Sequence, residues 1–147
     1  VYTYWKRTGP SPVMMTLDAS KRDVCTVKRE KTATPLQSFV LMNDPQFVEA
    51  ARMLAARTLT EKPDAKQRIA FIFQKLCSRP AQPAELEILF RLFQSQKKYF
   101  QQNKQQVEPY LSVGKKRIDS QLDSLEVAAL ATVTQTIMNF DECVMRR

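Results

Sequence analysis

The sequence contains no histidine among its 147 residues. Histidine is the commonest metal ligand in proteins and the usual general base near neutral pH. Ser-His, Cys-His and histidine-zinc sites therefore cannot be built from this chain alone. The three cysteines, Cys25, Cys77 and Cys143, lie far apart and include no C-x-x-C pair, which also excludes zinc-ribbon and thioredoxin-like sites.

Glycine is almost as scarce, because only Gly9 and Gly114 occur. Two glycines leave little material for the tight hairpin turns of an all-β fold or for a phosphate-binding loop. No apolar run approaches the roughly 20 residues of a membrane-spanning helix, so we expect no membrane span in this chain. With 44% hydrophobic and 26% charged residues, the composition is that of one globular, helical domain.

The cysteines leave two interpretations open. Cys77 falls on the apolar stripe of a predicted helix, where a small buried thiol is the simplest explanation. Cys25 and Cys143 would pair as a disulfide in an oxidising compartment and would remain free thiols elsewhere.

The net charge of +8 makes this a basic protein, and the charge is uneven along the chain. Residues 1–33 carry +4, residues 61–80 carry +3, and residues 81–118 carry +4. Such basic segments attract acidic polymers, although a solvated charged face explains most of them. Since no nucleic-acid motif accompanies the basic residues, we expect no nucleic-acid partner and consider an acidic glycan instead.

Helix signals begin at Thr34. The T-x-x-Q pattern at this residue is a capping box, and the following proline suits the first helical position, so we predict a helix over 35–42. Asp44 followed by Pro45 repeats the device and predicts a second helix. We expect Asn43, between the two, to adopt the left-handed conformation that ends the first helix.

The remaining helices are predicted from the same signals. D-x-x-Q at Asp64 starts a third helix, which ends before Pro80 because a residue that precedes proline is pushed out of the α region. Pro83 opens a fourth helix, which reaches Phe100. A short helix over 107–111 and a last helix that begins at Asp123, with D-x-x-E, complete the set. The last helix is apolar on most sides, so it belongs in the middle of the bundle.

Residues 1–33 show no sustained helical period. Prolines and the short β-leaning runs VYTYW and VMMTL indicate an extended, irregular arm. The predicted fold is therefore all-α, a bundle of five or six helices over residues 34–147 with this arm packing on it. We also expect the whole chain to be a fragment of a larger multidomain protein.

Four stretches of the sequence resemble the carboxy-terminal part of domain-of-unknown-function family 1553, and the resemblance spans nearly the whole chain. The most specific are R-x-x-T-x-T-P-L-Q and the following L-x-N-D-P-Q-F-V-E-A-A-R, and two substitutions depart from the family pattern, Ala33 in a turn and Gln82 at a cap. The four stretches are KRTGPSPVMMTLDA, VCTVKREKTATPLQSFVLMNDPQFVEAAR, RPAQPAELEIL and TIMNFDE.

The resemblance implies a setting and no reaction. Members of the family resemble secreted or periplasmic, sometimes membrane-anchored, proteins of bacteria that degrade complex polysaccharides. In these proteins the family occurs together with a planctomycete-type cytochrome c module and a second uncharacterised domain. The resemblance therefore implies a periplasmic or extracellular, cell-surface location. We therefore expect haem in upstream domains of the parent protein, and other domains of that parent as partners. Within this chain we expect no cofactor, because covalent c-type haem attachment needs C-x-x-C-H.

Two function classes follow. In the first, the chain is a helical scaffold or interaction module without catalytic residues of its own. In the second, its carboxylates form part of a hydrolase-type active site. Capping accounts for Asp44 and Asp123, and the residues with candidate functional or arm-anchoring roles are Asp18, Arg29, Glu30, Asn43, Asp141 and Glu142. For Arg29 and Glu30 the simplest interpretation is an ion pair that fastens the arm to the bundle.

Overall fold

A computed structural model describes residues 4–6, 8–20, 25, 27–28 and 32–144. The chain divides into two compact units, Val1–Val40 and Leu41–Arg147. The predicted packing of the arm on the bundle remains a prediction.

The first unit contains a short helix that the sequence analysis missed, α1 (Pro12–Thr16). Pro12 stands in its first turn, where the fixed φ of proline suits a helix and no backbone N–H is needed. The hydroxyl of Thr16 donates to the carbonyl of Pro12 at 2.9 Å. The β-leaning interpretation of VMMTL is therefore wrong, because these residues form a helical turn and no strand occurs among the described residues.

The first two predicted helices are separated by a single residue, Asp44. Helix α2 (Pro35–Asn43) begins at a reciprocal capping box, in which Thr34 and Gln37 bond each other's backbone N–H with their side chains. Asp44 then caps α3 (Pro45–Glu61) by accepting from the Gln46 N–H at 2.9 Å. The prediction for Asn43 is wrong: it is the last residue of α2 and does not have a positive φ. Proline at the next helix start ends α2 without a left-handed residue.

The second unit continues with the other predicted helices. These are α4 (Ala65–Cys77), α5 (Pro83–Gln102), α6 (Val107–Leu111) and α7 (Ser124–Met138), with a 3-10 turn at Lys104–Gln106. The expected caps are present, since Asp64 and Asp123 each accept a hydrogen bond from a first-turn backbone N–H. A further short helix, α8 (Asp141–Val144), was not predicted. The all-α fold class is confirmed for the described residues.

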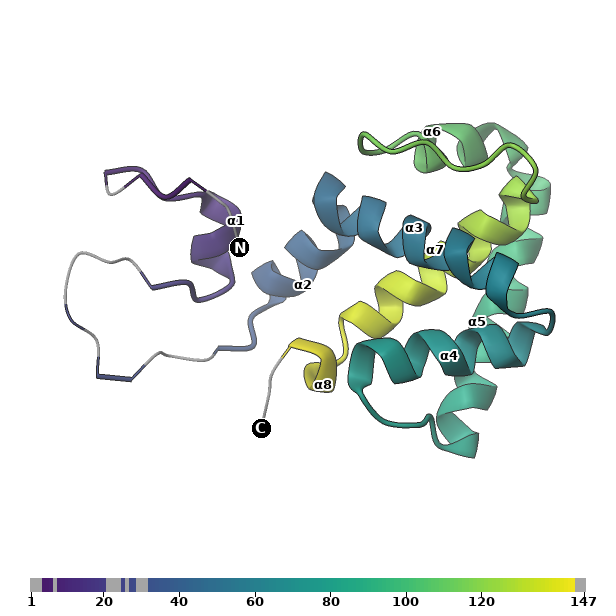
Figure 1. The fold of residues 1–147 in the computed structure, drawn as a ribbon, viewed down its shortest axis with the longest axis horizontal. Helices are drawn as coiled ribbons and strands as arrows, with labels where there is room; N and C mark the ends of the chain where they lie inside the picture. Colours follow the sequence, from purple (N-terminus) through teal and green to yellow (C-terminus); the bar gives the residue numbers. More distant parts are fainter. Residues whose placement is uncertain (1–3, 7, 21–24, 26, 29–31, 145–147) are drawn as a thin grey trace. The chain divides into compact units, whose positions relative to one another are not determined.

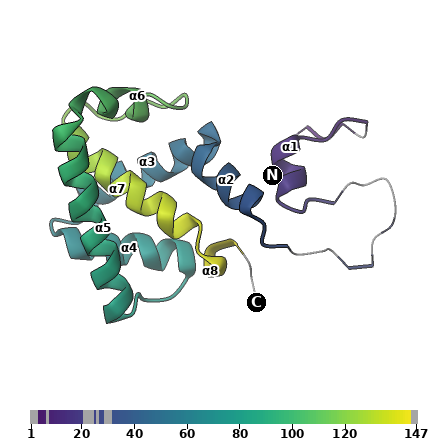
Figure 2. The ribbon, with the colours of Figure 1, turned by 180° about the vertical axis from the view of Figure 1, so that it is seen from behind.

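Helix α7 forms the centre of this unit, as its all-round apolar sequence predicted. It contacts α3, α4, α5, α6 and α8, and both views show it, in yellow, running between the other helices (Figures 1 and 2). Val127, Leu130, Val133 and Ile137 are fully buried, and the alanines between them let the neighbouring helices approach closely. None of the described helices is both long enough and apolar enough to cross a membrane.

Candidate functional site

Asp18 lies in a hydrogen-bonded cluster within the first unit. Its carboxylate accepts from the backbone N–H of Thr32 at 2.7 Å, from the Thr32 hydroxyl at 2.8 and 2.9 Å, and from Nε2 of Gln37 at 3.0 Å. Asp18 itself has φ +56°, a conformation that aspartate tolerates better than most residues. The cluster joins the segment after α1 to the start of α2, and a carboxylate held by so many donors is an anchor.

Gln37 belongs to the Asp18 cluster and to the capping box at once. Its Oε1 accepts from the Thr34 N–H while its Nε2 donates to Asp18 and to the Thr32 hydroxyl. The side chain is buried, so each of its polar atoms needs a partner, and each has one. Arg29 and Glu30, the predicted ion pair just before this helix, lie outside the described residues.

Glu142 is brought to a different place, the junction of α4, α5 and α8. Arg79 donates from Nε to Glu142 at 2.7 Å and from Nη1 and Nη2 to Glu85 at 2.8 and 2.7 Å. Glu85 also accepts from the N–H of Gln82 at the start of α5. Its hydrogen bonds to the Arg79 guanidinium lower the pKa of Glu85 from 4.5 to about 2. Asp141 is the exposed first residue of α8, next to this ion-pair network.

Aromatic rings and two thiols surround the same junction. The Arg79 guanidinium lies 4.8 Å from the centroid of Phe73, which meets Phe140 edge to face at 5.9 Å. Burial, and then the neighbouring Cys143, raise the pKa of the Cys77 thiol from 9.0 to about 11. Burial also raises the pKa of Cys143. The thiol of Cys77 is therefore protonated at neutral pH, and the residue is half-buried where the sequence predicted a buried one.

Sequence reasoning missed a second anchor, made by α3 and the loop after α6. Arg52 is fully buried and donates from Nε to the carbonyl of Val113 at 2.7 Å and from Nη2 to the carbonyl of Lys116. One turn earlier, Glu49 accepts from the N–H groups of Lys115 and Lys116, each at 2.9 Å. These bonds lower the pKa of Glu49. The spacing of three residues, E-x-x-R, was the available signal, because it puts both charges on one helix face.

Gly114 explains how the loop can lie so close to α3. Its φ is +93°, and a Cβ at this position would stand 2.2 Å from Oε2 of Glu49. Glycine is therefore required here both for its backbone conformation and for the close approach of the carboxylate.

Residues 117–120, which follow this anchored loop, line an open pocket together with α6 and the start of α7, and the sequence analysis also missed it. Its volume is about 470 Å³, within the range of small-ligand sites. We call it the α6–α7 pocket. It is lined by Lys104, Val107, Glu108, Leu111, Ser112, Arg117, Ile118, Asp119, Ser120, Ser124 and Leu125. The lining contains two basic and two acidic side chains, so its formal net charge is zero.

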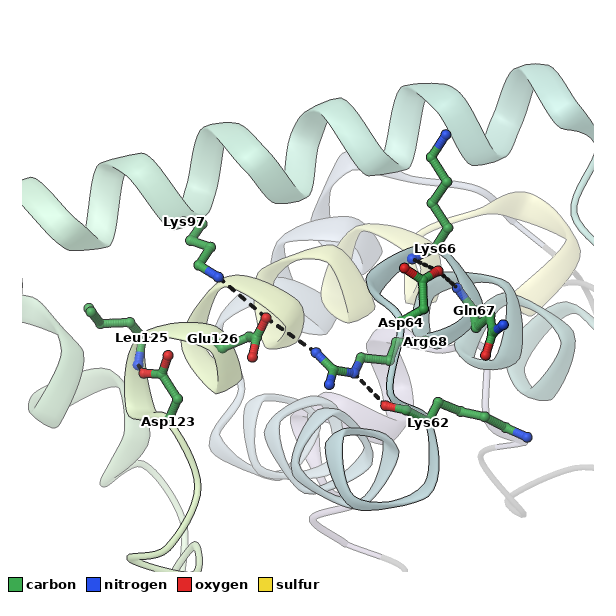
Figure 3. Close-up of polar contacts among 9 residues, drawn as sticks. All are labelled: Lys62, Asp64, Lys66, Gln67, Arg68, Lys97, Asp123, Leu125 and Glu126. Atoms are coloured by element: carbon green, nitrogen blue, oxygen red, sulfur yellow. Dashed lines mark hydrogen bonds and ion pairs between the residues drawn. The ribbon is translucent and has the colours of Figure 1, made fainter.

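A polar network joins the central helix to its neighbours close to this pocket. Figure 3 shows Glu126 of α7 between Lys97 of α5, at 3.4 Å, and Arg68 of α4, at 3.2 Å. Nε of Arg68 also donates to the carbonyl of Lys62 at 2.7 Å, which ties the end of α3 to α4. Glu126 thus serves as a half-buried structural acid.

No group of three or more Cys, Asp or Glu side chains that could hold a metal ion occurs among the described residues. Over the whole sequence there is no histidine and no C-x-x-C-H, so the donor set does not fit covalently attached haem. The methionines considered as approaching a haem held elsewhere are Met14 and Met15, which lie on α1, and Met138, which is the half-buried last residue of α7.

The sequence profile of PSD1, described as a protein of unknown function (DUF1553), matches residues 1–93. The chain belongs to this family. The match ends within α5, short of the near-complete coverage expected from the sequence, so α6, α7 and α8 lie beyond it. No curated protein and no solved structure matches the chain.

Proposed function

We propose that the chain is a non-catalytic interaction module that binds an acidic partner, with an acidic glycan as that partner. The observation that carries the proposal is how the charged side chains of residues 41–147 are used. Their carboxylates are largely occupied within the fold, whereas many of their cations are not.

The carboxylates serve as caps, anchors and ion pairs. Three aspartates cap helices, and Glu49 binds loop N–H groups. The glutamates that pair with basic side chains are Glu61, Glu85, Glu87, Glu126 and Glu142. Glu142, one of the candidate functional residues, accepts a hydrogen bond from Nε of Arg79 at 2.7 Å, so this carboxylate oxygen is already occupied within the fold.

Several cations, by contrast, make no ion pair in the part of the chain that the structure describes. They are Lys62, Lys75, Lys98, Lys104, Lys115, Lys116 and Arg117. Solvated cations that exceed their acidic neighbours create a positive field, which draws in acidic polymers. Residues 61–118, which contain all of them, carry a net charge of +7.

The setting is part of the proposal. The resemblance described above supports a large secreted or periplasmic parent protein, linked to polysaccharide breakdown, in which upstream domains hold haem. In that setting the helical module would dock on other domains of the same parent and hold an acidic glycan near them.

A retention assay tests the proposed function. The purified chain is run by affinity electrophoresis through gels that contain polygalacturonate, dextran sulfate or neutral dextran. We expect retardation by both acidic polymers, weakened by 0.5 M salt because screening shortens the reach of the charges, and none by dextran. Equal migration in all three gels, with or without salt, would contradict the proposal.

One observation favours the hydrolase alternative, at residues other than those predicted. The α6–α7 pocket places two carboxylates, Glu108 and Asp119, in one small-ligand cavity with three serine hydroxyls. Glycoside hydrolysis uses a carboxylate pair separated by about 5–10 Å. If this alternative holds, the chain should release reducing ends from an acidic polysaccharide, and Glu108→Gln should abolish the release without changing the unfolding free energy.

A further inference from the structure

A second cavity, formed by the end of α3, the outer side of α4 and the α4–α5 connection, has a different chemistry from the α6–α7 pocket. Its volume is about 340 Å³, and we call it the Phe71 pocket. It is lined by Lys62, Gln67, Ala70, Phe71, Gln74, Pro80 and Ala81. The polar groups of this lining are one ammonium and two amides, and it includes no carboxylate.

Two ammonium groups share the ring of Phe71. Nζ of Lys62 lies 5.5 Å from the ring centroid and Nζ of Lys75 lies 5.3 Å from it. Both distances are within the range of a cation–π interaction, which attracts each cation but does not neutralise it. The positive charge at the pocket is therefore held close to an aromatic surface.

The acids nearest in sequence are used elsewhere. Glu61 pairs with Arg57 at 2.6 Å, and Asp64 accepts hydrogen bonds from the N–H groups of Lys66 and Gln67. Figure 3 shows that the ammonium end of Lys62 points away from Glu126, while its backbone carbonyl receives the Arg68 bond. Neither lysine pairs with a carboxylate among the described residues, so both are available to an external anion.

We propose that the Phe71 pocket binds one acidic sugar unit, a uronic acid or a sulfated sugar, of a glycan chain. The apolar C–H face of a sugar ring packs on an aromatic ring, and Phe71 is the aromatic residue that lines the pocket. The amides of Gln67 and Gln74, one helical turn above and below the ring, can donate to and accept from sugar hydroxyls. The ammonium groups of Lys62 and Lys75 bind the carboxylate or sulfate.

The size and layout of the pocket favour a sugar over a nucleic acid. One aromatic side chain provides one stacking surface, whereas a single-strand platform needs successive aromatics along a basic groove. A cavity of about 340 Å³ fits one or two sugar rings. This inference rests on the proposed function, of which it names the site.

The test compares variants of the full chain by titration with trigalacturonate, followed by amide chemical shifts and by calorimetry. Phe71→Leu keeps an apolar side chain on α4 but removes the ring, and should weaken binding about tenfold, whereas Phe71→Tyr should retain it. Lys62→Gln with Lys75→Gln should weaken binding about five- to tenfold. The matched control, Lys6→Gln with Lys28→Gln, removes the same charge from exposed positions of the first unit, which do not line the pocket, and should change affinity less than twofold.

The outcomes separate the pocket from the proposed function. If acidic polymers retard the chain but the pocket variants and the control weaken binding equally, the assignment of the binding site to the Phe71 pocket is wrong. The proposed function itself would still hold in that case. Shifts confined to residues around Phe71 in the titration, without retardation by any polymer, would support the pocket and overturn the wider function. Tighter binding of single-stranded RNA than of the acidic sugar at this pocket would overturn the choice of ligand. Loss of binding in Phe71→Tyr as well would overturn the stacking role.

Discussion

Arg52 gives the sharpest test of the energetics of this fold, because it combines full burial with two hydrogen bonds to a distant loop. The perturbation is Arg52→Met, which fills much of the same volume but cannot donate to the carbonyls of Val113 and Lys116. A hydrogen bond from a charged group contributes about 1.5–3 kcal/mol, and two carbonyls would lose their partner. Nη1 of Arg52 has no hydrogen-bond partner among the described residues, so its removal recovers part of the loss.

We therefore expect Arg52→Met to lower the free energy of unfolding by about 2–4 kcal/mol. Small domains have a total of about 5–15 kcal/mol, so the variant should still fold. With a urea dependence of about 2 kcal/mol per molar, the middle of the range for small proteins, the midpoint of unfolding should fall by about 1–2 M. Helix α3 supplies a matched control, Arg57→Met, whose exposed ion pair with Glu61 should contribute no more than about 0.5 kcal/mol.

The loop provides a second readout. Lys115, Lys116 and Arg117 are trypsin sites, and the bonds to Glu49 and Arg52 hold this segment on α3. Limited proteolysis should cut this loop faster in Arg52→Met than in Arg57→Met. In Arg52→Met the loop opens more easily, because the two hydrogen bonds from Arg52 to the loop carbonyls are absent. If both variants have the same midpoint and the same cleavage rate, the anchoring role assigned to Arg52 is refuted.

Four further predictions concern other parts of the chain. Asp44→Ala should cost about 1 kcal/mol in urea unfolding through loss of the α3 cap, and an unchanged midpoint would contradict the capping role. Glu85 has its folded-state pKa lowered to about 2, so its contribution is complete above pH 4.5 and is lost as the pH falls towards 2. The stability difference between wild type and Glu85→Gln should therefore shrink over that range, and a constant difference would contradict the ion pair. At pH 8 a thiol reagent should label exposed Cys25 first and half-buried Cys77 slowly, because the pKa of Cys77 is about 11, and equal rates would contradict that raised pKa. Deleting residues 1–30 should lower the melting temperature sharply if the arm packs on the bundle, and an unchanged value would assign the arm to another partner.

The helix framework was predictable because its signals are local. Thr34, Asp44, Asp64 and Asp123 each mark a helix start through a side chain that bonds a backbone N–H within three residues. The central position of α7 followed from an apolar surface too broad for any place except the core. No longer-range information is needed for either inference.

The anchors and pockets were not predictable because they depend on contacts between distant residues. Arg52 and the carbonyl of Lys116 are 64 positions apart, and Arg79 and Glu142 are 63 apart. Asp18 was chosen as a candidate because capping did not account for it, and its partners, Thr32 and Gln37, emerged only from the fold. The short helices α1 and α8 were missed because one turn leaves no periodic pattern to detect.

We propose above that this module binds an acidic glycan through its charge and does not cleave it. The most direct measurement is the affinity of the full chain for trigalacturonate and for its fully methyl-esterified form, which is neutral but has the same sugar rings. We predict binding of the acidic form at least about tenfold tighter than of the ester, with no new reducing ends after prolonged incubation. Equal affinity for the two forms, or release of shorter sugars, would contradict the claim.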